Sequence, residues 1–222
     1  AANRNDFKTA YKLWLPLAEQ GGSDAQLNLG SMYFNGQGVP QNYKEAVKWY
    51  RLSAEQQHMH AQFNLGAMYD FGQGVPQDYK EAAKWYWLSA LQGYDLAQFN
   101  LGEMYGQGLG VPQDYKEAVK WYRLSAEQGH AKAQFKLGVM SDQGLGVKQD
   151  FEEAYKLWLP LAEQGYAQAQ FNLGTMFYNG QGVLKDFELA HMWFNLSDFN
   201  GIRSAAENRN LVEKKMSPSQ IK

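Results

Sequence analysis

A 36-residue period constrains this 222-residue chain more than any other feature. Alanine–glutamine pairs recur at that step, at Ala25-Gln26, Ala61-Gln62, Ala97-Gln98, Ala133-Gln134 and Ala169-Gln170. Leucine–glycine pairs and glycine-x-glycine triplets keep the same step. A fixed period of this length is typical of a solenoid, in which each repeat buries its apolar face only by stacking on its neighbours.

Each repeat is predicted to contain two helices. In the first, Ala61, Leu65, Met68 and Tyr69 are spaced to form one apolar stripe. Gly66 lies on the flank of that stripe. A glycine inside a helix costs about 1 kcal/mol relative to alanine. Its recurrence in five repeats therefore predicts that a neighbouring helix passes too close for a side chain.

The second helix is predicted to begin at a capping box. In Asp78-Tyr-Lys-Glu81, the Asp side chain is expected to accept from a backbone N–H and the Glu side chain to reach back to the N-cap N–H. The same pattern stands at Asn42–Glu45, Asp114–Glu117 and Asp150–Glu153. Gly93 is suited to a left-handed C-cap, and Gln57 takes the equivalent place one repeat earlier.

The period predicts that the whole chain, residues 1–222, is a single repeat domain. Asp6–Gln20 resembles Asp150–Gln164 four periods later, so residues 6–21 are expected to be a half repeat. The complete repeats are expected at residues 23–57, 59–93, 95–129, 131–165 and 167–201, followed by an incomplete C-terminal cap at 202–222.

The glycine-rich turns are connectors rather than nucleotide sites. A phosphate-binding turn follows a strand and carries a third glycine or a Gly-Lys-Ser/Thr at fixed offset. Here a helix precedes Gly36-Gln-Gly38, Val-Pro follows it, and the turn occurs five times.

Composition removes several classes of partner and site. The net charge is −2 without a basic stripe, and no apolar run approaches a membrane span, so neither nucleic acid nor membrane insertion is expected. The absence of cysteine excludes disulfides and thiolate ligands. His58 and His60 form a His-x-His without an evident third ligand. We expect no metal and no cofactor.

Catalytic motifs are also missing. The sequence has no Gly-x-Ser-x-Gly elbow and no His-Glu-x-x-His. The recurring carboxylates are interpreted as capping residues. We therefore expect that the chain is not an enzyme. A hydrolase acting on cell-wall material would need a cluster of carboxylates or histidines that the sequence does not reveal.

The segment AQFNLGAMYDFGQGVPQDYKEAAKWYWLSA, residues 61–90, resembles the Sel-like (Sel1-like) repeat family, which is related to tetratricopeptide repeats. The resemblance implies an all-α, right-handed α/α superhelical solenoid of helix-turn-helix repeats, whose first helices line a concave groove. Such proteins usually bind a protein or peptide as scaffolds, and some resemble adaptors, virulence factors or immunity proteins. The cysteine-rich branch of the family has a disulfide in each repeat, and its properties are not expected here.

The resemblance also indicates a cellular location. Bacterial members are often exported, and this chain starts at Ala1-Ala2 rather than Met. We therefore expect a periplasmic or secreted protein whose signal peptide has been removed, or otherwise a cytoplasmic one. We expect a monomer.

A candidate binding stripe runs along the first helices. An α-helix turns by about 100° per residue, and this rotation places the stripe on a different side of the helix from Leu65 and Tyr69. One position is almost always an amide: Asn28, Asn64, Asn100, Lys136 and Asn172. Two flanking positions vary, as Asp24, His60, Leu96, Lys132 and Gln168, and as Ser31, Ala67, Glu103, Val139 and Thr175. Variable residues beside a constant amide are what a peptide groove requires.

The asparagines have two interpretations. An amide both donates and accepts, so it can pair with an extended backbone of any sequence; alternatively, it bridges helices within the repeat. Four asparagines with about two bonds each at ~1 kcal/mol give roughly 8 kcal/mol, which a micromolar complex already requires before association costs. Apolar anchors would have to supply the rest, and the candidates are Phe63, Phe71, Leu96, Phe99 and Phe171, most of the phenylalanines being expected to pack internally.

A second candidate lies on a second helix. Trp87 and Leu91 stand where two other repeats carry arginine and glutamate. An exposed Trp/Leu pair is a plausible hot spot, and the alternative is that Trp87 packs on a neighbouring helix. A protein that inhibits a toxin or enzyme by occlusion would use such surfaces and loops as well as the groove.

Overall fold

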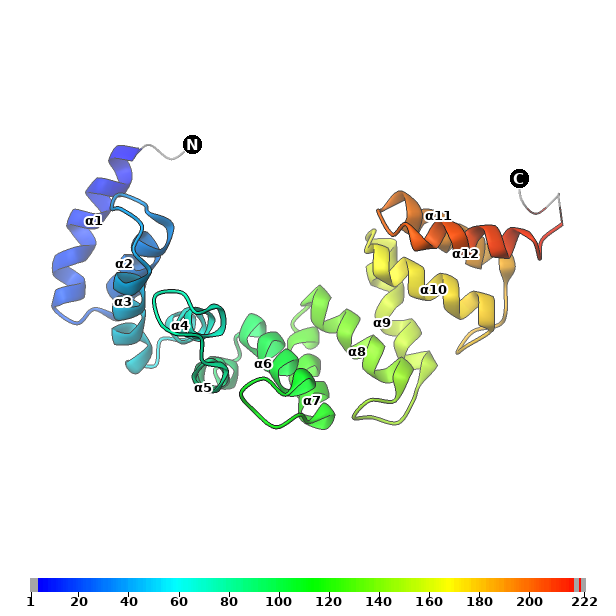
Figure 1. The fold of residues 1–222 in the computed structure, drawn as a ribbon, viewed down its shortest axis with the longest axis horizontal. Coiled ribbons are helices and arrows are strands. Elements are labelled where there is room, and N and C mark those ends of the chain that lie inside the picture. The colour runs from blue at the N-terminus through cyan, green and yellow to red at the C-terminus, as the bar shows by residue number, and fades with distance from the viewer. Residues whose placement is uncertain (1–3, 218–219, 221–222) are drawn as a thin grey trace. The chain divides into compact units, whose positions relative to one another are not determined.

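A computed structural model describes residues 4–217 and 220, and these residues form twelve α-helices and no strand (Figure 1). The expected all-α helical repeat solenoid is confirmed. The helices are α1 (Arg4–Glu19), α2 (Ser23–Asn35), α3 (Tyr43–Glu55), α4 (Met59–Phe71), α5 (Tyr79–Leu91), α6 (Asp95–Gln107), α7 (Tyr115–Glu127), α8 (Ala131–Gln143), α9 (Phe151–Glu163), α10 (Ala167–Asn179), α11 (Phe187–Phe199) and α12 (Ser204–Glu213).

The chain divides into two compact units, which are described separately: an N-terminal unit, Ala1–Ser125, and a C-terminal unit, Ala126–Lys222. Within each unit, successive helices pack in sequence order, as α1 to α5 do in the N-terminal unit and α8 to α12 in the C-terminal unit (Figure 1). Residues 218, 219, 221 and 222 of the predicted cap lie outside the described part of the chain.

The first helices end as predicted. In α4, Gly72 is the C-cap with a left-handed φ of 66°, and its N–H donates to the Met68 carbonyl. A side chain rarely adopts this conformation, which explains the glycine. Gly93 and Gln57 also have positive φ, at 92° and 66°, as their C-terminal positions predict.

The glycine inside each first helix leaves room for an aromatic ring. A Cβ atom built on Gly66 would lie 2.8 Å from the Tyr86 ring, and one on Gly102 would lie 2.7 Å from the Tyr122 ring. The predicted close approach is confirmed, and the group that approaches is the aromatic side chain of the following second helix.

Half of the capping-box prediction is wrong. Asp78 accepts from the N–H groups of Lys80 and Glu81 at 3.0 and 3.1 Å, as expected. Its own N–H, however, donates to the carbonyl of Tyr69 at 3.0 Å, so Glu81 has no capping role. The Glu81 carboxylate instead lies 3.5 Å from Lys84 Nζ. The turn thus folds back on the first helix and ties the two helices together.

Buried polar side chains join neighbouring repeats. Ser89 Oγ donates to the Met59 carbonyl at 2.9 Å, and Gln98 Nε2 donates to the Ala90 carbonyl at 3.2 Å. Equivalent bonds recur in the C-terminal unit, from Ser197 to Ala167, from Gln170 to Ala162 and from Asn200 to Gln170. Glutamine of the Ala-Gln pair is therefore a buried bridge between repeats, a role that its polarity alone did not indicate.

Candidate functional site

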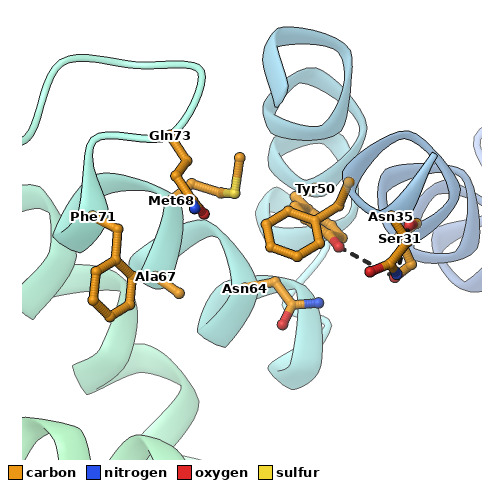
Figure 2. A pocket seen from close by; sticks show the side chains of 9 residues that line it. Ser31, Asn35, Tyr50, Asn64, Ala67, Met68, Phe71 and Gln73 are labelled. Atoms are coloured by element: carbon orange, nitrogen blue, oxygen red, sulfur yellow. Dashed lines mark hydrogen bonds between the residues drawn. The ribbon is translucent and has the colours of Figure 1, made fainter. Parts of the chain in front are cut away.

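A hollow lies between α2 and α4 in the N-terminal unit, with Tyr50 of α3 on its wall (Figure 2). We call it hollow A. Its volume is about 560 Å³. It is lined by Ser31, Phe34, Asn35, Tyr50, Asn64, Ala67, Met68, Phe71 and Gln73. Three of these, Ser31, Asn64 and Ala67, belong to the predicted binding stripe.

Hollow A has an aromatic and amide lining. The Tyr50 hydroxyl donates to Ser31 Oγ at 3.2 Å (Figure 2). Burial raises the pKa of Tyr50, so its hydroxyl stays a neutral donor at physiological pH. Phe71 is 69% exposed at the rim. An open hollow with an exposed ring and a few polar groups suits a side chain that is mostly apolar.

The C-terminal unit contains an equivalent hollow, which we call hollow B, with a volume of about 240 Å³. It is lined by Phe135, Val139, Asp142, Gln143, Trp158, Asn172, Thr175, Met176 and Gln181. Val139, Asn172 and Thr175 stand three periods after Ser31, Asn64 and Ala67 of hollow A. The same positions of the repeat thus line an equivalent cavity in each unit.

One period further, the C-terminal unit has hollow C, of about 190 Å³. It is lined by Thr175, Tyr178, Asn179, Phe194, Asn208 and Leu211. Asn208 on α12 continues the amide position of the stripe by one 36-residue step. The sequence interpretation stopped at Asn172 and missed it, although the period alone could have found it.

Hollow B differs from the other two at one wall. Phe34 in hollow A and Tyr178 in hollow C occupy the position that is Asp142 in hollow B. Burial raises the pKa of the Asp142 carboxyl above its ordinary value. Hollow B therefore combines an acid with aromatic side chains, whereas the walls of A and C at this position are aromatic.

The predicted asparagines are half-buried. Some line a hollow, as binding of a partner requires, and one bonds within the repeat, as a structural role requires. Asn64 lines hollow A and Asn172 lines hollow B. Asn100 forms a side-chain hydrogen bond with Tyr86. Asn28 lines none of the three hollows. Recognition of a partner backbone by these amides stays a prediction.

The flanking positions are accessible to different degrees. Of the first set, Asp24, Leu96, Lys132 and Gln168 are exposed, whereas His60 is half-buried against Tyr94 with ring centroids 4.9 Å apart. Of the second set, Ser31, Ala67, Val139 and Thr175 line hollows, whereas Glu103 accepts from the Tyr122 hydroxyl at 2.6 Å. Lys136, at the amide position, is half-buried.

Most candidate anchor phenylalanines pack internally, as expected. Phe63 lies against Tyr94 with centroids 5.1 Å apart, and Phe171 lies against Phe194 at 5.5 Å. Phe71 is the exception because it remains exposed at the rim of hollow A.

Trp87 and Leu91 lie at the surface of α5, 44% and 57% exposed. More than half of the Trp87 side chain is thus covered, and the alternative that it packs on a neighbouring helix stays open. Their role in binding stays a prediction.

Metal-binding clusters and membrane spans are the remaining classes of site. Among residues 4–217 and 220, no three His, Asp or Glu side chains gather to hold a metal ion. His58 Nε2 lies 3.0 Å from the exposed Asp24 carboxylate instead. No helix in this part of the chain is long and apolar enough to cross a membrane.

A family model described as Sel1 repeat matches residues 23–58, 60–94, 95–130, 131–166 and 167–197. No match was found among curated proteins.

Solved structures show the same architecture. The chain is 38% identical to a protective antigen of uropathogenic Escherichia coli strains with an SLR fold, with a TM-score of 0.83, over 88% of this chain and 42% of that one. The chain thus spans less than half of that antigen. A Sel1 repeat protein from Oxalobacter formigenes is 35% identical, with a TM-score of 0.81, over 90% of this chain and 80% of that one. An immunity protein from Pseudomonas aeruginosa, 22% identical with a TM-score of 0.51 over 94% and 79%, shares the fold alone.

Proposed function

Because this chain belongs to the Sel1 repeat family, we propose that it is a scaffold that binds extended segments of a partner protein in hollow A of its N-terminal unit and in hollows B and C of its C-terminal unit. The Sel1 repeat fold commonly mediates protein–protein interaction, and proteins of this kind are typically non-catalytic scaffolds. The proposal adds where the partner binds and through which groups.

The recurrence of one hollow at one register of the repeat carries the proposal. Hollows A, B and C all use the stripe position of Ser31 and Ala67 for one wall and the amide position of Asn64 for another. An extended chain presents side chains at regular intervals with free backbone groups between them. Cavities that each have an asparagine in their lining are suited to such a ligand, because the amide can donate to and accept from its backbone.

Hollow A provides the apolar anchor that the asparagines alone lack. Phe34 and the exposed ring of Phe71 flank a volume of about 560 Å³. An apolar side chain transferred there from water contributes roughly 1.5–3 kcal/mol when fully buried. This contribution adds to that of the amides and offsets part of the free-energy cost of association.

A second candidate is occlusion of a folded enzyme or toxin by an exported inhibitor. The exposure of Trp87 and Leu91 favours it, because large apolar side chains outside the hollows suit a flat protein interface. This candidate predicts contacts on α5 as well as in hollow A.

Site-specific photo-cross-linking in envelope and cytosol fractions of the source cell tests both candidates. A benzoylphenylalanine at Phe71, at Trp87 or at Leu184 would report hollow A, the α5 surface and a control loop, Leu184 being 91% exposed and lining no hollow. A partner captured from Phe71 and not from Leu184 is the expected result. Capture from Trp87 as well as from Phe71 would replace the proposal with the occlusion candidate, and equal capture at all three positions would contradict both. The fraction that yields the partner tests the expected export.

A further inference from the structure

Asp142 is a carboxylate without a side-chain donor in the described part of the chain. It is half-buried on the wall of hollow B. Its backbone carbonyl accepts from Gln149 Nε2 at 2.7 Å, but no side chain within residues 4–217 and 220 donates to its carboxylate. Burial of an ionised group without a donor costs free energy. A native residue that carries this cost is a candidate for function.

The repeat itself shows how such an acid is normally satisfied. Asp70 stands two periods before Asp142 and accepts from the Tyr86 hydroxyl at 3.1 Å. Trp158 stands two periods after Tyr86, and an indole has no hydroxyl. Its Nε1 instead donates to the Phe135 carbonyl at 3.2 Å. The change from tyrosine to tryptophan therefore removes the donor and leaves the acid facing the cavity.

The remaining walls suit a cation. Phe135 is half-buried on the wall of hollow B, whereas Trp158 beneath it is only 2% exposed. The Phe135 ring can therefore attract an ammonium or guanidinium group. The side chains of Gln143, Asn172 and Gln181 bring carbonyl oxygens that can accept from such a group. Asp142 is the one charged residue among the nine that line hollow B.

We infer that hollow B binds the cationic side chain, arginine or lysine, of the partner segment. The inference rests on the proposed function and adds the chemistry of the residue that this hollow selects. Asp142 forms the charge-assisted hydrogen bond, and the half-buried ring of Phe135 packs against the apolar stem. An anionic side chain would be repelled by Asp142, and an apolar one would bury the carboxylate further without a donor. A divalent metal ion is disfavoured because one carboxylate supplies too few ligands.

Selection of displayed random nonapeptides on the full-length chain tests the inference. The native protein, Asp142→Asn and Asp70→Asn would be panned in parallel. Asp70→Asn is the matched control because it neutralises an acid at the same repeat position, one that Tyr86 already satisfies. The native chain and Asp70→Asn are expected to enrich peptides with a basic residue at one position, and Asp142→Asn to lose that enrichment.

Affinity measurements then quantify the interaction between Asp142 and the basic residue of the peptide. For a selected peptide, Asp142→Asn is expected to weaken binding about 10-fold or more, the range for a hydrogen bond to a charged group, and replacement of the peptide's basic residue by glutamine should remove most of that difference. Peptides without basic enrichment, or the same enrichment on Asp142→Asn, would overturn the inference and leave the proposed function standing. Failure of the native chain to select any peptide would overturn both.

Discussion

Hollows A and B are built by the same positions of the repeat, three periods apart, yet they offer different chemistry. The frame is constant: Asn64 and Met68 of hollow A are matched by Asn172 and Met176 of hollow B. The walls change, because phenylalanine in hollow A is replaced by Asp142 in hollow B. A repeat protein can thus alter its selectivity by single substitutions on a wall while the packing beneath stays the same.

The largest expected effect is on the free energy of unfolding and comes from a substitution in the packing that hollows A and B share. Gly66→Ala places a methyl group 2.8 Å from the Tyr86 ring, closer than carbon atoms can approach. We expect it to lower the free energy of unfolding by about 1–3 kcal/mol, as overpacking does. Gly106→Ala is the control, because Gly106 is also helical but its nearest neighbour would lie 3.6 Å away.

Urea unfolding followed by circular dichroism measures both variants. Gly106→Ala should be neutral or stabilising by up to about 1 kcal/mol, through helix propensity alone. Equal stability changes in the two variants would show that the ring contact does not explain the glycine.

A second prediction converts hollow B toward the arrangement at Asp70. Trp158→Tyr supplies a hydroxyl that can donate to Asp142 as Tyr86 does to Asp70. We expect the affinity for peptides with a basic residue to fall about 3–10-fold, because the acid then has an internal partner. Stability should fall by about 1 kcal/mol with the loss of the indole bond to Phe135. Isothermal titration against a selected peptide decides the matter, and an unchanged affinity would count against Asp142 as the contact.

A third prediction concerns the exposed ring of hollow A. Phe71 is 69% exposed, so Phe71→Ala should change the free energy of unfolding by no more than about 0.5 kcal/mol. It should weaken partner binding by about 1 kcal/mol or more, as an interface anchor does. Phe199→Ala is the matched control, because Phe199 is 88% exposed and lines no hollow. Equal binding by both variants would remove Phe71 from the site.

The smallest expected effect is on thermal stability, and it shows whether Asp142 serves binding or stabilises the fold. Burial raises the pKa of Asp142 from its ordinary value near 3.8. A raised carboxyl pKa contributes stability at pH values below the unfolded value, and this contribution is lost as pH rises through the folded value. At neutral pH the ionised acid is therefore destabilising, and Asp142→Asn should raise the melting temperature by about 1 °C.

The same gain should vanish below about pH 3.8, where the native carboxyl is protonated in both states. Thermal melts across this range, recorded with Asp70→Asn as control, provide the measurement. A variant that is less stable than the native chain at neutral pH would show that Asp142 serves the fold.

The sequence predicted the frame of these hollows better than their walls. The period, the glycine beneath the aromatic ring and the left-handed caps follow from local rules that repeat five times. The capping role of Glu81 was wrong because the Asp78 N–H is taken by the Tyr69 carbonyl, nine residues earlier in the chain. That contact depends on how the turn folds back, which no local motif specifies.

The walls were missed for a different reason. Tyr50 and its equivalents are aromatic in every repeat, and such a position is typical of a core. Only the structure shows that the Tyr50 hydroxyl reaches a cavity. Asp142 was overlooked because a single acid on a helix is usually a solvated residue. Its meaning emerges from the loss of a tyrosine hydroxyl on another helix.

The most direct test exchanges the walls and leaves the frame intact. The double variant Asp142→Phe with Trp158→Tyr gives hollow B the residues that hollow A carries at those positions. Peptide selection on this variant and on the native chain, after circular dichroism has verified that both are folded, would compare their preferences. We expect that the preference for a basic residue disappears and that an apolar residue is selected in its place. Retention of the basic preference by the double variant would contradict the claim that these walls determine which partner is bound.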